Sequence, residues 1–461
     1  MEFDGEKSGK GTGMVQGAAQ RGEGGERPWK VDRLSVVPSY VDFLHKYLIT
    51  NRPCILPRAL IEDWPAWKEW RCGTTSCASS SSTSSNKDVA KEDADANMDL
   101  RLHRSFLLLA SRYGEHVVPV VVRRGEEEEE RREMKLKDAV EEMRCARARG
   151  RSVAKGAEGG SEETLIYIKD WHLVRLSRLA GQEAPYVTPD LFRDDWMNND
   201  SPLTPNPDVT ASSSSTLPDD FRFCYAGLSG TFTPLHRDVY TSYSWSTNIV
   251  GRKRWTLYSP QLAPLLRRAD GRGAPLSEGE RLELEERKSG CRGERVEVVQ
   301  EEGETIFVPS NCYHEVFNLS DCISLNHNWC NSVNLPRMYD AMKEEMGEVR
   351  YALRDVEEML RTAGQGERGS PWQVEFWGLV AEVSRADAGW DWAQFWGMVR
   401  DWTDRPGCEA ELQPDWGSFV QLRLRAMCED FKRQEEWLWL EEGVRGCVAE
   451  VERRCTEGDE E

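Results

Sequence analysis

Two histidines and one aspartate in this sequence have the residue types and the spacing of a metal site. His236 and Asp238 are two residues apart in TFTPLHRD, and His314 follows in FVPSNCYHEVFN. Because residues i and i+2 of a β-strand point to the same side, this imidazole and this carboxylate can contact one ion. Two histidines and one carboxylate form the facial triad of non-haem iron sites, which leaves coordination positions open. We expect their metal-facing atoms to converge within ~5 Å of one point.

The His-x-Asp pair alone does not define such a site, because this pair also occurs in turns and on surfaces. His314 strengthens the metal interpretation, since it lies in an apolar strand pattern and a β-rich segment separates it from the pair. The remaining histidines have weaker claims. His45 and His103 lie in helix-like stretches, whereas His172 and His327 follow strands, where a position in the core or in a pocket is expected.

Lys253 is a further candidate, because it lies within the apolar strand pattern NIVGRKRWTLYSP. A buried lysine requires an anion that compensates its lost hydration. A bound dicarboxylate co-substrate would supply that anion. The alternative is a solvent-facing strand lysine between Arg252 and Arg254, and the strand pattern alone favours neither interpretation.

Short strands must position these side chains. From Phe221 to Trp329, segments rich in aromatic and β-branched residues alternate with Gly and Pro turns, a pattern typical of a sandwich or jelly roll. Upstream, the patterns predict a helix and short strand (40–60), a strand (115–122), a solvated helix (125–150), and a strand leading into a helix (164–173). Beyond residue 335 the pattern is helical. Six tryptophans there are expected to anchor helix packing: Trp372, Trp377, Trp390, Trp392, Trp396 and Trp402.

The composition indicates a folded core with disordered insertions. The chain has 461 residues, enough for two to four domains at ~100–200 residues each. Its hydrophobic content of 39% is low for a fully packed globule. We expect four parts: a disordered tail (1–28), an α/β part with disordered insertions (29–220), a β core (221–335) and a helical region (336–461). Disorder is expected at 73–97 and 201–217, flexibility at 149–163, and a charged insertion at 267–295.

The formal net charge of -20 gives no support to direct nucleic-acid binding and suits a basic protein substrate better. The first 27 residues have no apolar signal sequence, and no run of ~18 apolar residues predicts a membrane span. The 13 cysteines lack the spacing of a zinc site and are interpreted as reduced thiols. We therefore expect a cytoplasmic protein, with the nucleus as an alternative. The oligomeric state is left open.

The strands around these residues resemble the catalytic core of the jumonji C (JmjC) oxygenases. The resemblance is carried by FTPLHRDVYTSYSWSTNIVGRKRWTLYSP and GETIFVPSNCYHEVFNLSDCISLNHNW, and it extends through YIKDWHL and RFCYAGLSG to cover Pro38 to Asn334. It implies a mainly β fold with α-helices, namely a double-stranded β-helix (jelly roll, cupin-like) with flanking helices and a C-terminal helical region. It also implies that His236, Asp238 and His314 bind Fe(II), with 2-oxoglutarate and O2 as co-substrates.

The same resemblance implies roles for further residues. Lys253 would pair with the distal carboxylate of 2-oxoglutarate, with its ammonium pointing into the β-helix near Tyr167 and Thr233, which would help to hold that carboxylate. Asn326 and Asn328 match pocket-lining positions. Several relatives have an asparagine after the tryptophan that corresponds to Trp245, whereas this chain has a serine there.

Three functions fit these features. The resemblance is closest to the lysyl hydroxylase branch, which implies hydroxylation of a protein side chain, with a translation termination factor as the candidate substrate. An N-methyl-lysine (histone) demethylase is the first alternative, although a zinc-binding reader module is missing and many such demethylases have Glu where this chain has Asp238. A non-catalytic binding protein on the same fold is the second, and the complete ligand set argues against it.

Overall fold

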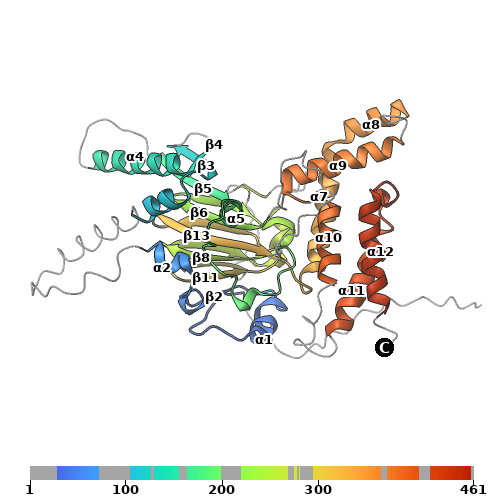
Figure 1. Cartoon of the computed structure of the whole chain (residues 1–461), viewed down its shortest axis with the longest axis horizontal. Coiled ribbons are helices and arrows are strands. Elements are labelled where there is room, and N and C mark those ends of the chain that lie inside the picture. The colour runs from blue at the N-terminus through green and yellow to red at the C-terminus, as the bar shows by residue number, and fades with distance from the viewer. Residues whose placement is uncertain are drawn as a thin grey trace, which may run out of the picture.

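The computed structural model describes residues 29–71, 104–125, 129–154, 164–198, 220–267, 275–277, 280, 294–364, 371–403 and 416–457. Within these residues, two β-sheets form the centre of the molecule, and a group of C-terminal helices packs at one end (Figure 1). The segments 1–28, 73–97, 201–217 and 155–163, for which disorder or flexibility is predicted, lie outside the described residues. The charged insertion at 267–295 does so almost entirely.

The larger sheet has nine strands in the order β1-β2-β11-β8-β13-β6-β5-β3-β4. Every neighbouring pair is antiparallel except β1 and β2. Because β5 pairs with β6, the sheet continues across residue 220, and upstream strands extend the expected β core. The strands are β1 (Asp32–Arg33), β2 (Cys54–Leu56), β3 (Val117–Arg124), β4 (Glu130–Lys135), β5 (Thr164–Trp171), β6 (Arg222–Gly227), β8 (Tyr243–Val250), β11 (Thr305–Val308) and β13 (Cys322–Trp329).

The smaller sheet has four strands in the order β10-β9-β12-β7. These are β7 (Phe232–His236), β9 (Lys253–Tyr258), β10 (Arg295–Gln300) and β12 (His314–Asn318). Ile306 and Val308 of the larger sheet pack with Trp255, Leu257 and Val316 of the smaller one, so an apolar cluster joins the two sheets. Most connections between β6 and β13 lead from one sheet to the other. This arrangement confirms the predicted jelly-roll, cupin-like core.

The prediction of a solvated helix over 125–150 is wrong in its first part. Glu130–Lys135 is strand β4, which pairs along its length with β3. The charged run favours a helix by local propensity, but the free edge of β3 supplies hydrogen-bond partners that override this preference. Helix α4 (Leu136–Ala154) then begins, and it buries Leu136, Val140 and Met143 rather than being solvated on all sides. It also includes the first residues of the segment predicted to be flexible.

Large aromatic side chains cover the outer face of the larger sheet. Along β8, Tyr243, Trp245 and Ile249 point into this core, where Phe192 stacks on Trp245 with 5.5 Å between ring centroids. The intervening Ser244 and Ser246 point to the opposite face, toward the smaller sheet, as the period of two in a strand requires. The core is completed by α1 (Tyr40–Phe43), η1 (Leu44–Leu48), η2 (Arg58–Leu60), α2 (Pro65–Glu69), α5 (Leu173–Leu179) and η3 (Asp190–Phe192).

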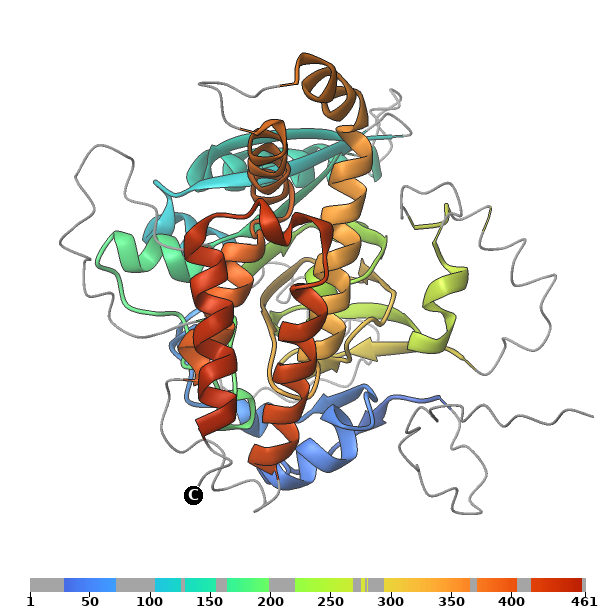
Figure 2. The same cartoon turned by 90° about the vertical axis from the view of Figure 1, so that its right-hand side faces the viewer.

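The C-terminal helices form a second core beside the sheets (Figure 2). They confirm the predicted helical region, and the six predicted tryptophans all belong to this core or pack against it. Tyr240, from the connection between β7 and β8, enters the same core. The helices are α7 (Leu335–Ala352), α8 (Arg354–Ala363), α9 (Trp372–Ala388), α10 (Trp392–Thr403), α11 (Trp416–Phe431), η8 (Glu435–Leu438) and α12 (Glu442–Glu457).

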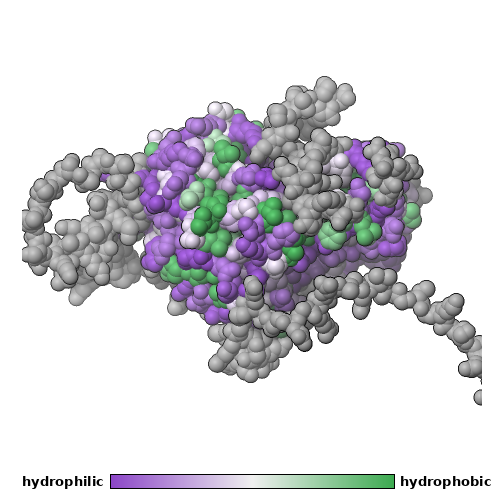
Figure 3. Space-filling view, turned by 90° about the horizontal axis from the view of Figure 1, so that it is seen from below, coloured by the Kyte–Doolittle hydropathy of each residue, from purple (hydrophilic) through white to green (hydrophobic). Residues whose placement is uncertain are grey.

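The polarity of the surface, the cysteines and the hydropathy of the helices can be compared with the composition. In the view of Figure 3 the described surface is mainly hydrophilic, with hydrophobic residues in small groups. Every cysteine in the described ranges is free. Among the helices of those ranges, none is both long enough and apolar enough to cross a bilayer.

Gly251 lies in the turn between β8 and β9, two residues before Lys253. It provides a test of the backbone conformation of this turn. Its φ is +87°, and a Cβ there would lie 2.2 Å from the carbonyl oxygen of Asp321. We expect Gly251→Ala to lower the free energy of unfolding by about 2 kcal/mol or more, because strain and overlap add. Gly378→Ala is the control, since its helical site is open and alanine there should stabilise by up to about 1 kcal/mol. Equal effects in urea denaturation would contradict this account.

Candidate metal centre

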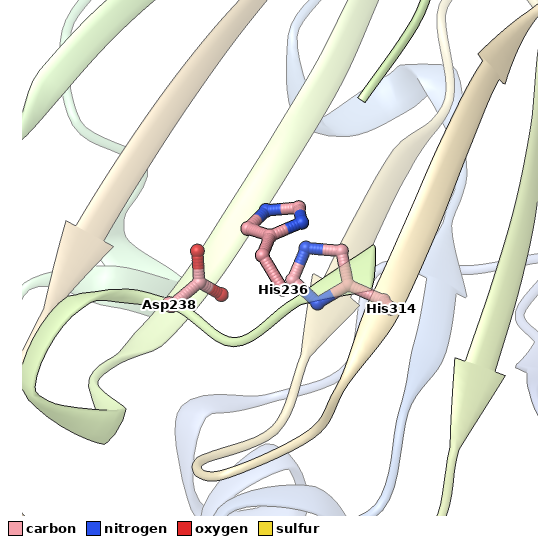
Figure 4. Close-up of side chains that lie close together, drawn as sticks. All are labelled: His236, Asp238 and His314. Carbon is pink, nitrogen blue, oxygen red and sulfur yellow. The ribbon is translucent and has the colours of Figure 1, made fainter. Parts of the chain in front are cut away.

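The strand register brings His236 and His314 directly opposite each other. His236 ends β7, His314 begins β12, and the two residues are paired in the antiparallel ladder. Their ring centroids are 4.2 Å apart. Asp238 follows in extended backbone two residues after His236, and Figure 4 shows its carboxylate directed toward the two rings. One ligand atom from each residue lies within 4.8 Å of the other two, which confirms the predicted convergence.

Backbone carbonyls orient both imidazoles. Nδ1 of His236 lies 2.8 Å from the carbonyl oxygen of Pro234, and Nδ1 of His314 lies 3.0 Å from that of Cys312. Because a carbonyl oxygen only accepts hydrogen bonds, each Nδ1 carries the hydrogen and each Nε2 has its lone pair available for a metal. Ser244 Oγ donates to Oδ2 of Asp238 at 2.6 Å, which fixes the carboxylate in the same way.

The surroundings favour the neutral form of the His236 imidazole. Burial lowers the pKa of His236 below its ordinary value, and the neighbouring His314 lowers it further, whereas Asp238 acts in the opposite direction. Trp255 stacks on the His314 ring with 5.5 Å between centroids and separates it from water on that side. A neutral imidazole is the form that binds a divalent cation, so the neutral form of His236 suits Fe(II), and two imidazoles with one carboxylate are the donor types of such a site.

Lys253 is buried between the two sheets. Its side chain is 2% exposed, its Nζ donates to Ser324 Oγ at 2.7 Å, and the Tyr225 ring centroid lies 5.8 Å from Nζ. Within the described part of the chain, no carboxylate forms an ion pair with this ammonium. Burial lowers the pKa of Lys253 to about 8, although Cys322 and Cys224 oppose this effect. A buried ammonium with only neutral partners is the arrangement that a carboxylate ligand would complete.

Four polar side chains on the inner face of the larger sheet link the surroundings of Lys253 to those of Asp238. We call them the polar strip: Ser244 and Ser246 of β8, and Ser324 and Asn326 of β13. Ser324 Oγ and Ser246 Oγ both donate to Oδ1 of Asn326, at 3.2 and 3.0 Å. Since Ser324 accepts from Lys253 and Ser244 donates to Asp238, the strip lies between the ammonium and the candidate ligand. The serine that follows Trp245 thus supports Asn326.

Tyr167 and Thr233 belong to a second polar group next to Lys253. Tyr167 is buried beside Thr233 and Asn318, and burial raises the pKa of its hydroxyl above the ordinary value. Asn318 is opposite Lys253 in the ladder between β12 and β9, so the two side chains share the inner face. Asn328 lies further along β13, and its Nδ2 donates to Ser242 Oγ at 3.1 Å, toward the turn that follows Asp238.

Several residues around Lys253 and Asp238 were missed by the sequence reasoning, namely Tyr225, Asn318, Ser244 and Ser324. The available signal was a period of two of polar residues inside otherwise apolar strands. The remaining histidines lie elsewhere: His327 hydrogen-bonds with Asp195 on the other face of β13, His172 with Asp220 and His116 with Gln182, and His45 is exposed. His103 is outside the described residues.

The family comparison agrees with this geometry. A family model described as a cupin-like domain matches residues 41–334. The JmjC domain-containing protein 1 of Schizosaccharomyces pombe is 30% identical over 413 residues, which cover 80% of this chain and 82% of that protein. The chain therefore belongs to the cupin-like JmjC-domain family.

Two further relatives indicate where in the family the chain lies. The 2-oxoglutarate and iron-dependent oxygenase JMJD4 of Danio rerio is 32% identical over 330 residues, 70% of this chain. The arginine-specific demethylase JMJ20 of Arabidopsis thaliana is 29% identical over 330 residues, also 70% of this chain. The matched regions span 65% and 61% of those two proteins, less than two thirds of each.

The unpaired ammonium of Lys253 leads to a prediction about stability and pH. The folded-state pKa is about 8 and the ordinary value is 10.5, so between these pH values the unfolded state binds more protons and wild-type stability rises with pH. We expect Lys253→Met to stabilise the ligand-free protein by about 1–3 kcal/mol at pH 7, because it removes a buried charge. This advantage should shrink as the pH rises from 8 toward 10.5.

The measurement is urea denaturation at pH 7, 8 and 9. Lys46→Met, on an exposed helical position, is the control and should change stability by less than about 0.5 kcal/mol at each pH. Destabilisation by Lys253→Met at pH 7 would show that the ammonium is compensated in the free protein.

Proposed function

We propose that this chain is an Fe(II)- and 2-oxoglutarate-dependent oxygenase that hydroxylates a protein side chain. The observation that carries the proposal is the combination of a converged His-Asp-His set with a buried, carboxylate-free ammonium in one inter-sheet space. The similarity to the zebrafish 2-oxoglutarate and iron-dependent oxygenase supports it. For the substrate we propose a lysyl side chain, with a translation termination factor as the candidate protein, as the family resemblance implies.

The metal would be held by Nε2 of His236, Nε2 of His314 and the Asp238 carboxylate. A set of two histidines and one carboxylate would leave part of the coordination shell of the ion to other ligands. When bound, Fe(II) supplies the chemistry that oxidatively decarboxylates 2-oxoglutarate and inserts one oxygen atom into a C–H bond. The protein fixes the ligand geometry through the Pro234 and Cys312 carbonyls and Ser244.

The co-substrate would lie along the polar strip. Lys253 would bind the distal carboxylate, which replaces the missing counter-charge, and the 2-oxo acid end would then reach the metal side. Ser324 and Asn326 hold fixed positions along this path through their mutual hydrogen bond. Tyr167, Thr233 and Asn318 would supply hydroxyl and amide partners for the same carboxylate, and Asn318 lies opposite Lys253 in the ladder.

N-demethylation is the second candidate function, and the similarity to the Arabidopsis arginine-specific demethylase favours it. The same centre serves both reactions, because hydroxylation of an N-methyl carbon gives an unstable product that releases formaldehyde. The two functions therefore differ in the substrate that enters and not in the metal ligands.

Titration of 2-oxoglutarate into Mn(II)-loaded protein tests the role of Lys253. We expect Lys253→Ala to raise the Kd for 2-oxoglutarate by about 30-fold or more, since a buried charge-assisted contact contributes roughly 2–5 kcal/mol. Its Mn(II) affinity should change little. Arg254→Ala is the control, because the adjacent side chain is exposed on the outer face and stacks on Phe317. Equal Kd values for wild type and Lys253→Ala would remove this residue from the co-substrate site.

Mass spectrometry of the product decides between hydroxylation and demethylation. Unmodified and N-methylated lysyl and arginyl peptides, including peptides of a translation termination factor, are incubated with Fe(II), 2-oxoglutarate and O2. We expect the unmodified lysyl peptide to gain one oxygen atom, whereas demethylation would remove one CH2 unit from a methylated peptide. Asp238→Ala should abolish either change. Succinate formation without modification of any peptide would contradict both substrate assignments.

A further inference from the structure

The segment that carries His236 and Asp238 is attached to the C-terminal helices at two points, Arg237 and Tyr240. Arg237, between the two candidate ligands, donates from Nη2 to Glu344 of α7 at 2.9 Å. Its Nη1 donates to Oδ1 of Asn311, in the turn before His314, at 3.3 Å. The side chain of this intervening residue therefore contacts both the helical region and the turn that leads to the third ligand.

Tyr240 forms the second attachment. It is 5% exposed, and its hydroxyl donates to the carbonyl of Ala388 at 2.8 Å, with the carbonyl of Trp390 at 3.3 Å. The same hydroxyl accepts from the backbone N–H of Trp390 at 3.0 Å. Its ring packs between Phe221 and Trp390, with centroid distances of 6.3 and 6.0 Å. Tyr240, from the turn that follows Asp238, is thus held by hydrogen bonds and ring packing at the C-terminal end of α9.

The backbone of this turn requires external support. Tyr240 and Thr241 both have φ of 51°, a left-handed backbone conformation that residues other than glycine rarely adopt. Such a conformation persists only where surrounding contacts impose it. Besides the Tyr240 hydroxyl, Ser310 Oγ donates to the Thr241 carbonyl at 2.6 Å. The turn η4 (Val239–Thr241) directly follows Asp238, so its conformation determines where the carboxylate points.

We propose that Tyr240 is a positioning residue for Asp238 and that the C-terminal helices are, through it and Arg237, a working part of the metal centre. The two histidines are held by the ladder between β7 and β12, but Asp238 lies beyond the end of its strand. The hydrogen bonds of Tyr240 hold the backbone next to Asp238 in place, as the strand ladder holds the backbone of the two histidines. This inference rests on the proposed function, because it concerns the affinity of that centre for a divalent metal.

A pair of Tyr→Phe variants in the full-length chain tests the proposal. Tyr240→Phe removes the hydroxyl that binds Ala388 and Trp390. Tyr339→Phe is the matched control, since Tyr339 is also buried in the helical core and its hydroxyl donates to Asp430 at 2.8 Å, within that core. For each variant, Mn(II) affinity is measured from the free Mn(II) signal in electron paramagnetic resonance, and stability from a thermal melt.

We expect Tyr240→Phe to weaken Mn(II) binding about tenfold, the size of effect typical of residues that orient metal ligands. Tyr339→Phe should lower Tm comparably and leave Mn(II) affinity unchanged. If both variants lower Tm alike and both bind Mn(II) as wild type does, Tyr240 is only a packing residue and the inference is overturned. If wild type itself fails to bind Mn(II), or if His236→Ala binds it equally well, the proposed function fails instead.

The first attachment, between Arg237 and Glu344, gives a test that does not depend on the folding of Tyr240→Phe. Glu344 is half exposed, so Glu344→Gln keeps the helix and weakens only the pairs with Arg237 and Arg267. We expect Mn(II) affinity to fall about threefold, as for the loss of a partly exposed ion pair. Glu435→Gln, which weakens the Arg350 pair within the helical region, should have no effect. Identical affinities for both glutamine variants and wild type would overturn the role of the helices.

Discussion

The antiparallel register of β7 and β12 is the constraint on which the candidate metal centre depends. It places His314 opposite His236 on the inner face, and a slip of one residue would turn the third ligand to the outer face. β12 is held on both edges, because it also pairs with β9. At the far end, the backbone N–H of Asn318 donates to the Thr231 carbonyl, and the N–H of Gly230 donates to the Asn318 carbonyl. The ladder thus leaves His314 no alternative position.

The residues between the two sheets form an apolar cluster on one side and a polar group on the other. On one side, Ile306 and Val308 pack on Trp255 and Leu257, and the stacking of Trp255 on His314 joins this apolar cluster to the metal centre. On the other side, the serine hydroxyls of the polar strip donate hydrogen bonds to Asn326 and Asp238, which lowers the cost of their burial. Lys253 is the exception among these groups. Its ammonium has no carboxylate partner among the described residues, so we expect its burial to destabilise the ligand-free protein and an anionic ligand to offset this cost.

The sequence was sufficient for the parts of this site that local patterns encode. The His-x-Asp spacing and the apolar strand around His314 predicted the convergence, and the alternation of short strands and turns predicted the jelly roll. It was not sufficient where tertiary contacts decide. The run Glu130–Lys135 has helical propensity but pairs with β3. Ser324 and Tyr225 could not be assigned to the inner face before the register was known, and Tyr240 contacts residues 150 positions away.

The position of Asp238 connects the helical region to the candidate metal centre as well as to the fold. A metal ligand on a strand inherits the precision of the ladder, whereas a ligand in a turn has only the side chains around it. Here those side chains are Ser244, which binds the carboxylate itself, and Tyr240, which fixes the next turn of backbone against α9. Metal affinity depends on how little the ligands must reorganise on binding. If His236, Asp238 and His314 bind a metal as proposed, the packing of the helices against η4 contributes to the affinity of that centre, although the candidate ligands all lie outside the helices.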